Sequence, residues 1–155
     1  MKLIKFGSRN SFIKWFYSKD RNIDYPLVDL NFRHCWEEDT HIYRAVDDKK
    51  DIGVIFISCC YPEEMWIDLF EIKDGNHKKG FGTEMFQLLM EKHKPCYIKL
   101  ECVEEYDEEK EAHHFWKKMG FHKTREKYLG CEVFKKTYKK KYWKEYDKLF
   151  AANSR

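Results

Sequence analysis

Alternating apolar and polar positions predict β-strands in the middle of the chain. Two runs rich in β-branched and aromatic residues flank the polar break Asp47–Asp51, so His41–Ser58 is expected to form a hairpin. Met65–Ile72 is apolar on both faces except at Asp68 and Glu71, which is typical of a strand in a covered sheet. Further strands are predicted at 1–6, 96–103 and 131–138.

Apolar residues spaced three or four apart predict four helices. One starts after Ser8 or Ser11, the candidate N-caps, and another directly behind the glycines of Gly75–Phe86. A third ends at Gly120, and a fourth covers 139–151. The expected apolar stripes are Phe12, Ile13, Phe16 and Tyr17; Phe81, Met85, Leu88 and Leu89; Ala112, Phe115, Trp116 and Met119; and Tyr142, Trp143, Tyr146, Leu149 and Phe150.

The order of these elements indicates the fold class. From His41 onward it reads strand, strand, strand, helix, strand, helix, strand, which is typical of an α/β sheet of mixed direction flanked by helices. Residues 20–39 are expected to form a loop with a short helix. The chain contains no internal repeat and no Gly/Ser/Pro-rich linker, so a single domain over 1–155 is expected.

Composition then argues against several classes of protein. No apolar run reaches the ~20 residues of a membrane span, so no membrane partner is expected. Charged residues make up 37% of the chain, yet the net charge of +3 gives no argument for a nucleic-acid partner. We recognise no signal peptide, and the six cysteines form no CxxC pair. A cytoplasmic protein with buried thiols and no metal site is therefore expected.

The stretch Gly75–Phe86, GNHKKGFGTEMF, has the features of a phosphate cradle. Gly80 and Gly82 let the backbone approach a ligand closely, and a helix begins there whose first N–H groups and dipole favour an anion. Two lysines precede the glycines, and Thr83 adds a hydroxyl group. The stretch is neither GxxxxGK[ST] nor GxGxxG, because Met85 occupies the third glycine position.

Two motifs, in this order, resemble those of the GNAT family of acyl-CoA-dependent N-acyltransferases. The family's first motif, Arg/Gln-x-x-Gly-x-Gly/Ala at the start of a helix, corresponds to His77–Gly82. Its second motif, Ala-x-x-Phe-Tyr-x-x-x-Gly-Phe, corresponds to Ala112–Phe121, and a strand separates the two motifs as in the family. The resemblance implies a mostly antiparallel sheet flanked by helices, with a splayed pair of parallel strands, Met65–Ile72 and 96–103, at the cofactor site.

The resemblance also implies where acetyl-CoA would bind. Backbone groups of Phe70, Glu71 and Ile72 would hydrogen-bond its pantetheine arm like an additional strand. Ala112 and Trp116 would flank the other side of the cofactor. The residues whose backbone would hold the pyrophosphate are His77, Lys78, Lys79, Gly80, Phe81, Gly82 and Thr83.

Direct attack of an amine on the thioester requires a base that takes the amine proton. The family often carries an acidic residue where this chain has Trp66, so Asp68 or Glu71 is the candidate base. The Tyr that often protonates the departing thiolate in the family is Trp116 here, and an indole N–H cannot supply that proton. The alternatives for this role are Tyr106, His113 and Tyr128.

Three hypotheses on function follow. The first is an N-acetyltransferase that acylates a primary amine of a small molecule or peptide, as a monomer or homodimer. The second is an acyl-CoA-binding sensor or interaction module without turnover, which Trp116 favours. The third is an RNA-directed protein that uses the basic, aromatic tail 135–150, although packing of the tail's apolar stripe on the domain is the preferred interpretation.

Overall fold

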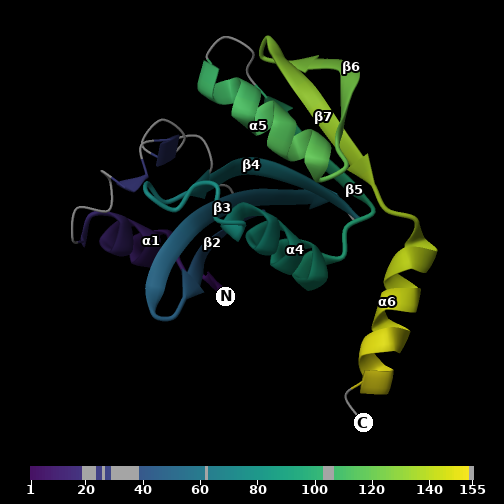
Figure 1. Cartoon of the computed structure of the whole chain (residues 1–155), viewed down its shortest axis with the longest axis horizontal. Helices are drawn as coiled ribbons and strands as arrows, with labels where there is room; N and C mark the ends of the chain where they lie inside the picture. Colours follow the sequence, from purple (N-terminus) through teal and green to yellow (C-terminus); the bar gives the residue numbers. More distant parts are fainter. Residues whose placement is uncertain (19–23, 26, 29–38, 62, 103–106, 154–155) are drawn as a thin grey trace. The chain divides into compact units, whose positions relative to one another are not determined.

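The chain folds as a mixed α/β protein (Figure 1). The computed structural model describes residues 1–18, 24–25, 27–28, 39–61, 63–102 and 107–153. Its strands are β1 (Lys2–Lys5), β2 (Thr40–Asp47), β3 (Lys50–Tyr61), β4 (Glu64–Ile72), β5 (Tyr97–Cys102), β6 (His122–Tyr128) and β7 (Cys131–Thr137). The helices for which bounds are given are α1 (Arg9–Phe16), α4 (Phe81–His93), α5 (Asp107–Lys118) and α6 (Lys140–Asn153).

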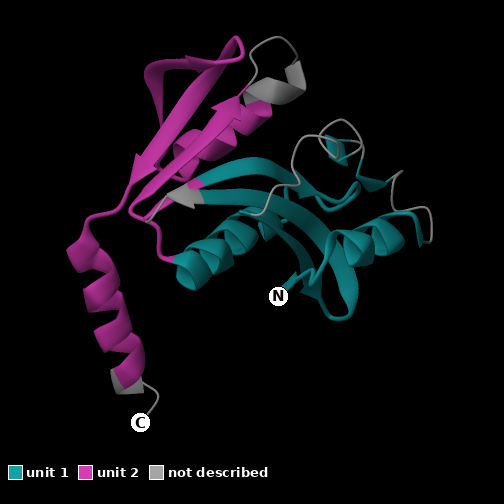
Figure 2. Ribbon diagram, turned by 180° about the vertical axis from the view of Figure 1, so that it is seen from behind, with its two compact units in different colours: residues 1–60, 66–93 teal, residues 61–65, 94–155 magenta. Residues whose placement is uncertain are grey.

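The described strands form one sheet in the order β1-β2-β3-β4-β5-β7-β6. This sheet is mostly antiparallel, with β4 and β5 as its parallel pair, so the predicted fold class is confirmed. The splay of that pair remains a prediction. The chain divides into two compact units, coloured separately in Figure 2: unit 1 holds residues 1–60 and 66–93, and unit 2 holds residues 61–65 and 94–155.

The predicted hairpin forms β2 and β3 of unit 1. Asp47 pairs with Lys50, and the two residues between them, Asp48 and Lys49, have φ of 47° and 66°. Positive φ at both central positions is the geometry of a type I′ turn, whose twist matches that of the two strands. The polar break in the sequence is therefore a two-residue turn.

Helix α1 packs its aromatic residues on one face of the unit 1 sheet. Ser8 is its N-cap: the Ser8 hydroxyl accepts from the Ser11 N–H at 3.1 Å, and the Ser11 hydroxyl accepts from the Ser8 N–H. Trp15 is buried, whereas Tyr17, expected in the apolar stripe, is 58% exposed because the helix ends at Phe16. The buried cluster includes Phe12, Trp15, Phe16, Ile42, Val54, Phe56 and Leu69.

Helix α4 covers the opposite face of the same strands. Val54 contacts the α1 cluster, and its neighbour Gly53 points the other way because side chains alternate along a strand. A Cβ built on Gly53 would lie 2.5 Å from the Met85 sulfur of α4 and 2.7 Å from the backbone oxygen of Glu71. Glycine at this position therefore lets α4 lie close to the sheet.

A buried polar contact fixes the other end of α4. The Tyr43 hydroxyl and His93 Nε2 are 2.8 Å apart. Burial lowers the pKa of His93 to about 4 and raises the pKa of Tyr43 to about 12. The ring is thus neutral near pH 7, and the tautomer of the imidazole sets which of the two groups donates the hydrogen bond.

In unit 2, the structure contains a strand that the sequence pattern did not predict. β6 pairs antiparallel with β7, and its residues, HKTREKY, are almost all exposed. Without a buried face there is no apolar alternation, which is why the sequence pattern did not predict this strand.

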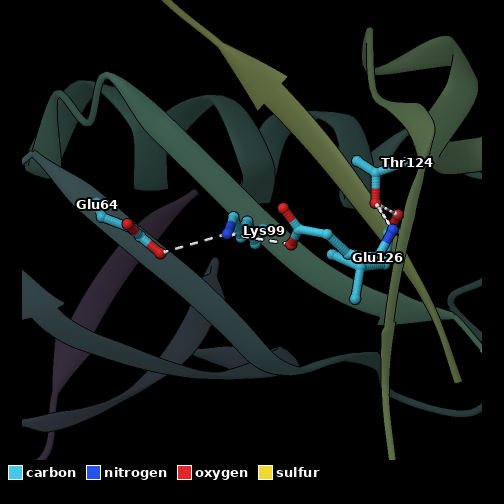
Figure 3. A network of polar contacts seen from close by, with 5 residues as sticks. Glu64, Lys99, Thr124 and Glu126 are labelled. Atoms are coloured by element: carbon cyan, nitrogen blue, oxygen red, sulfur yellow. Dashed lines mark hydrogen bonds and ion pairs between the residues drawn. The ribbon is translucent and has the colours of Figure 1, made fainter. Parts of the chain in front are cut away.

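A lysine on β5 is paired with acidic residues of two other strands. Lys99 lies between Glu64 of β4 and Glu126 of β6, with its Nζ 3.2 Å from Glu126 Oε2 and 3.9 Å from Glu64 Oε1 (Figure 3).

The predicted end of α5 is confirmed. Gly120 has φ of +87°, the Gly120 N–H donates to the Lys117 carbonyl, and the Phe121 N–H donates to the Trp116 carbonyl. These two bonds form a Schellman motif, for which glycine is the favoured residue. Lys136 of β7 adds a further bond by donating from Nζ to the Met119 carbonyl.

The predicted C-terminal helix is α6, but its stripe is not packed as expected. Trp143 is buried and donates from its indole N–H to the Pro95 carbonyl at 2.9 Å. Tyr142, Leu149 and Phe150 are 45%, 67% and 53% exposed. The helix is therefore held mainly through Trp143. None of the helices in the described part of the chain is long and apolar enough to span a membrane.

Gly53→Ala is expected to destabilise the fold by about 1–3 kcal/mol, because the backbone oxygen of Glu71 cannot move away as a flexible side chain would. Urea unfolding followed by circular dichroism measures the change. Gly7→Ala is the matched control, since no atom lies within 4 Å of a Cβ built there. Equal stability of both variants would contradict the close contact at Gly53.

Candidate active site

The glycine loop begins directly after β4 and is anchored at its start. The Lys73 N–H donates to the Ile52 carbonyl at 2.8 Å, which extends the pairing with β3 by one residue. The Lys73 ammonium forms an ion pair with Asp24 at 2.8 Å, and the Asp74 N–H donates to the Asp24 carbonyl. The segment that leads to the predicted cradle is thus fixed to two other parts of unit 1.

The backbone of the loop has the geometry of an anion-binding site. Lys78 and Gly80 have φ of 61° and 82°, and Lys79 lies between them. Alternation of left-handed with ordinary residues turns successive N–H groups toward one point, as in nests that bind phosphate. The Lys79 ammonium donates to the Gly75 carbonyl at 2.7 Å and so spans the loop.

Helix α4 starts at Phe81, directly behind this loop, as predicted. The N–H groups of its first turn, those of Phe81, Gly82 and Thr83, have no acceptor within the helix. No atom lies within 4 Å of a Cβ built on Gly80, so the surface there is open. The described structure thus joins a nest, a helix N-terminus and open space, the three components that a phosphate requires.

The two candidate bases on β4 point to opposite faces. Glu71 lies two residues from Leu69 and so shares the face covered by α1, where it is 6% exposed. Asp68 is exposed and accepts a hydrogen bond from the Ser58 hydroxyl at 2.6 Å. The half-buried Phe70 and Ile72 alternate with Glu71. The structure therefore does not bring Asp68 and Glu71 together.

Glu71 has the electrostatic environment of a group that exchanges protons near neutral pH. Burial raises the pKa of its carboxyl from 4.5 to about 7, and backbone N–H donors at Leu27 and Val28 oppose that rise. The Leu27 N–H donates to Oε1 at 3.1 Å. Among the described residues, no group hydrogen-bonds to Oε2. One carboxylate oxygen is thus fixed, and the other has no partner in the described part of unit 1.

The second motif lies in unit 2, on α5. Trp116 is buried, with its ring 4.9 Å from Phe115 and 5.1 Å from Phe121, and Ala112 lies one turn earlier on the same helix. Their contact with a cofactor remains a prediction. Tyr106, one alternative acid, lies outside the described residues.

His113 is more buried than the sequence suggested. A surface position was the preferred interpretation, but the residue is half-buried, its ring lies 5.0 Å from Phe134, and its Nε2 has no partner among the described residues. The adjacent His114 is exposed, as expected. Tyr128, the third alternative acid, is 52% exposed at the end of β6.

A comparison with models of protein families shows to which family the chain belongs. The model of the acetyltransferase (GNAT) family matches residues 9–121. The chain belongs to the GNAT acetyltransferase family. This match includes β4, the glycine loop and α5, and so contains both motifs on which the resemblance rested. No curated protein matches the sequence.

Solved structures show the GNAT fold at low sequence identity. A putative GNAT acetyltransferase from Bacteroides thetaiotaomicron has a TM-score of 0.67 at 18% identity, with 96% of each chain covered. A Bacillus subtilis acetyltransferase in complex with CoA has a TM-score of 0.64 at 15% identity, covering 89% of this chain and 99% of its own. Tetrahymena GCN5 has a TM-score of 0.63 at 16% identity, covering 88% and 96%.

The pH dependence of stability tests the burial of Glu71 in this GNAT fold. Its folded-state pKa is raised, so its contribution is present below about pH 4.5 and is lost as the pH rises through about 7. Relative to wild type, Glu71→Gln should therefore gain about 3 kcal/mol between about pH 5 and about pH 8.5. Urea unfolding across this range measures the gain.

Asp48→Asn is the control for that experiment, because it removes an exposed carboxylate at the β2–β3 turn. Its stability difference from wild type should not change over the same pH range. A Glu71→Gln difference that is equally independent of pH would show that Glu71 titrates as it does in the unfolded chain.

Proposed function

We propose that this GNAT chain transfers an acetyl group from acetyl-CoA to a primary amine of a small molecule or peptide. The observation that carries the proposal is the loop Lys73–Gly80, which joins a nest to the start of α4 beside an open surface. Among the similar structures, those from Bacillus subtilis and Thermoplasma acidophilum were solved with CoA. The same ligand at this loop is the simplest account of its geometry.

The loop residues fit the pyrophosphate of that ligand. Backbone N–H groups of residues 77–83 would hold the phosphate oxygens, and the dipole of α4 favours the negative charge. His77 stands where the family motif has Arg or Gln. Its side chain is 56% exposed, and its Nε2 lies 3.7 Å from Asp74 Oδ1. Because the cradle consists of backbone groups, this departure leaves it intact.

Glu71 is the base in this proposal. Acetyl-CoA would supply an acetyl thioester. The amine nitrogen would form the new bond to the carbonyl carbon, and the carbon–sulfur bond would break to release CoA as a thiolate, which would take up a proton. The amine must lose a proton to react, and a carboxyl group with a pKa of about 7 is half ionised near pH 7, where its carboxylate form is basic enough to take that proton. Oε2, which has no partner among the described residues, is the atom that would receive the proton. Asp68 is the weaker candidate, since its Oδ2 already accepts a bond from Ser58.

The alternative is an acyl-CoA-binding sensor without turnover. Trp116 supports it, because this buried residue packs against Phe115 and Phe121 and its indole cannot donate a proton to a departing thiolate.

The enzyme hypothesis needs another proton donor in place of the family's Tyr. His113 on the same helix is the group best suited to that role, since its Nε2 is buried and has no partner among the described residues. The two hypotheses share the cradle and differ only in chemistry.

Gly82→Glu should lower acetyl-CoA affinity at least about 100-fold, because its carboxylate would lie beside the first N–H groups of α4, where phosphate is expected. Isothermal calorimetry measures the affinity. Gly82→Ala separates the effect of a side chain from that of charge. Gln87→Glu adds the same charge at an exposed position one turn later and should bind like wild type. Equal affinity of Gly82→Glu and wild type would refute the cradle.

Thiol release from acetyl-CoA across a panel of amines distinguishes the enzyme from the sensor. The wild-type rate should rise through about pH 7 as Glu71 ionises, and Glu71→Gln should reduce kcat about 100-fold or more while acetyl-CoA still binds. Asp68→Asn is the matched control and should retain most activity. Tight binding without turnover of any amine would favour the sensor.

A further inference from the structure

Charge is distributed very unevenly along the chain. Residues 112–155 contain 13 Lys and Arg against 4 Asp and Glu, a net charge of +9. The preceding residues 1–111 contain 17 Lys and Arg against 23 Asp and Glu, a net charge of −6. The overall charge of +3 conceals this separation. Such an asymmetry indicates a partner with negative charge for the C-terminal part of the chain.

The attachment of α6 leaves one side of this basic region exposed. The indole N–H of Trp143 donates a hydrogen bond to the Pro95 carbonyl. Asp147, one turn further along the helix, forms an ion pair with Lys94. Lys140 forms an ion pair with Glu63 at 2.8 Å. Lys139, Lys141 and Lys144 remain exposed around the same helix. In Figure 2, α6 leads away from the β6–β7 pair within unit 2.

A hollow of about 240 Å³ lies at the start of α6 and combines aromatic rings with lysines. The rings of Tyr138 and Tyr142 lie 5.1 Å apart, and Tyr142 is 45% exposed. Aromatic contacts continue along the helix through Tyr146 to Phe150. The residues that line the hollow are Thr137, Tyr138, Lys139, Lys141, Tyr142 and Glu145.

The surface continues from this hollow onto the sheet. Thr137 is paired in register with Tyr97 of β5, which is 43% exposed. The Lys135 ammonium lies 5.0 Å from the centre of the Tyr97 ring. The exposed Tyr97 ring thus has an ammonium group beside it on the strands, and the exposed Tyr142 lines the hollow together with Lys139 and Lys141 at the start of α6. We call the residues Tyr97, Lys135, Tyr138, Lys139, Lys141 and Tyr142 the tyrosine–lysine surface.

We propose that the tyrosine–lysine surface binds single-stranded nucleic acid. Bases stack on exposed tyrosine rings, and phosphates contact the neighbouring ammonium groups, which is how sequence-tolerant single-strand sites work. Leu149 and Phe150 at the end of α6 are exposed and would suit a bilayer, but the hollow at the start of the helix contains hydroxyl groups and Glu145, which a bilayer-binding face would not place there. The proposed acetyl transfer is assigned to other residues, so either proposal can fail without the other.

Fluorescence anisotropy of labelled oligo(U) with the full chain tests the proposal. Affinity should fall with salt, and Lys139→Gln/Lys141→Gln should make the slope of log K against log salt shallower by about 1.4, for two lost phosphate contacts. Tyr142→Ala should weaken binding about tenfold, and Tyr142→Phe should restore it because the ring remains. Oligo(dT), run in parallel, shows whether the 2′-hydroxyl contributes.

Lys117→Gln/Lys118→Gln is the matched control, because it removes the same charge from exposed positions at the end of α5 in the same unit. It should leave the slope unchanged. The proposal is overturned if oligo(U) fails to bind at low salt, or if this control lowers the slope as much as the test pair. It is also overturned if anionic phosphatidylserine vesicles bind through Tyr142 while oligo(U) does not.

Discussion

The close contact between α4 and the sheet at Gly53 is the constraint on which unit 1 depends. Met85 lies directly over β3 because no side chain intervenes there. The Tyr43–His93 hydrogen bond fixes the other end of the helix. Since α4 is held at both ends and β4 is paired to β3 as far as Lys73, the loop between them has little freedom. Its left-handed residues Lys78 and Gly80 complete the connection and orient the N–H groups that would hold a phosphate in the proposed cradle.

The same region links the cradle to the candidate base. Lys73 and Asp74, at the start of the loop, bind Asp24. Glu71, two residues before Lys73, accepts from the Leu27 N–H. One short segment therefore contacts both the loop and the carboxyl group. Burial of a carboxylate costs stability unless it is well partnered, and Glu71 has a donor on only one oxygen among the described residues. Buried carboxyl groups with raised pKa values cluster at functional sites, which is why Glu71 is the candidate base in the proposed function.

Relatives with identities of 15–18% share this fold because packing constrains patterns rather than particular residues. A strand requires alternation, and a loop favours glycine where φ is positive, as at Gly80. The chemistry is less constrained by the fold. Trp116 packs in the core of unit 2 although it occupies the position of the family's tyrosine. The fold thus accommodates a tryptophan at this position.

The sequence by itself determined the β2–β3 hairpin, the glycine loop at the start of α4 and the order of strands with an apolar face, because these follow from local periodicity and backbone preference. Only the tertiary structure decided that β6 exists, that Glu71 rather than Asp68 is buried, and that the aromatic stripe of α6 is largely exposed. The physical reason is the same in each case. Burial of a side chain depends on what distant segments place beside it, and this information is not contained in the spacing of residues along one element.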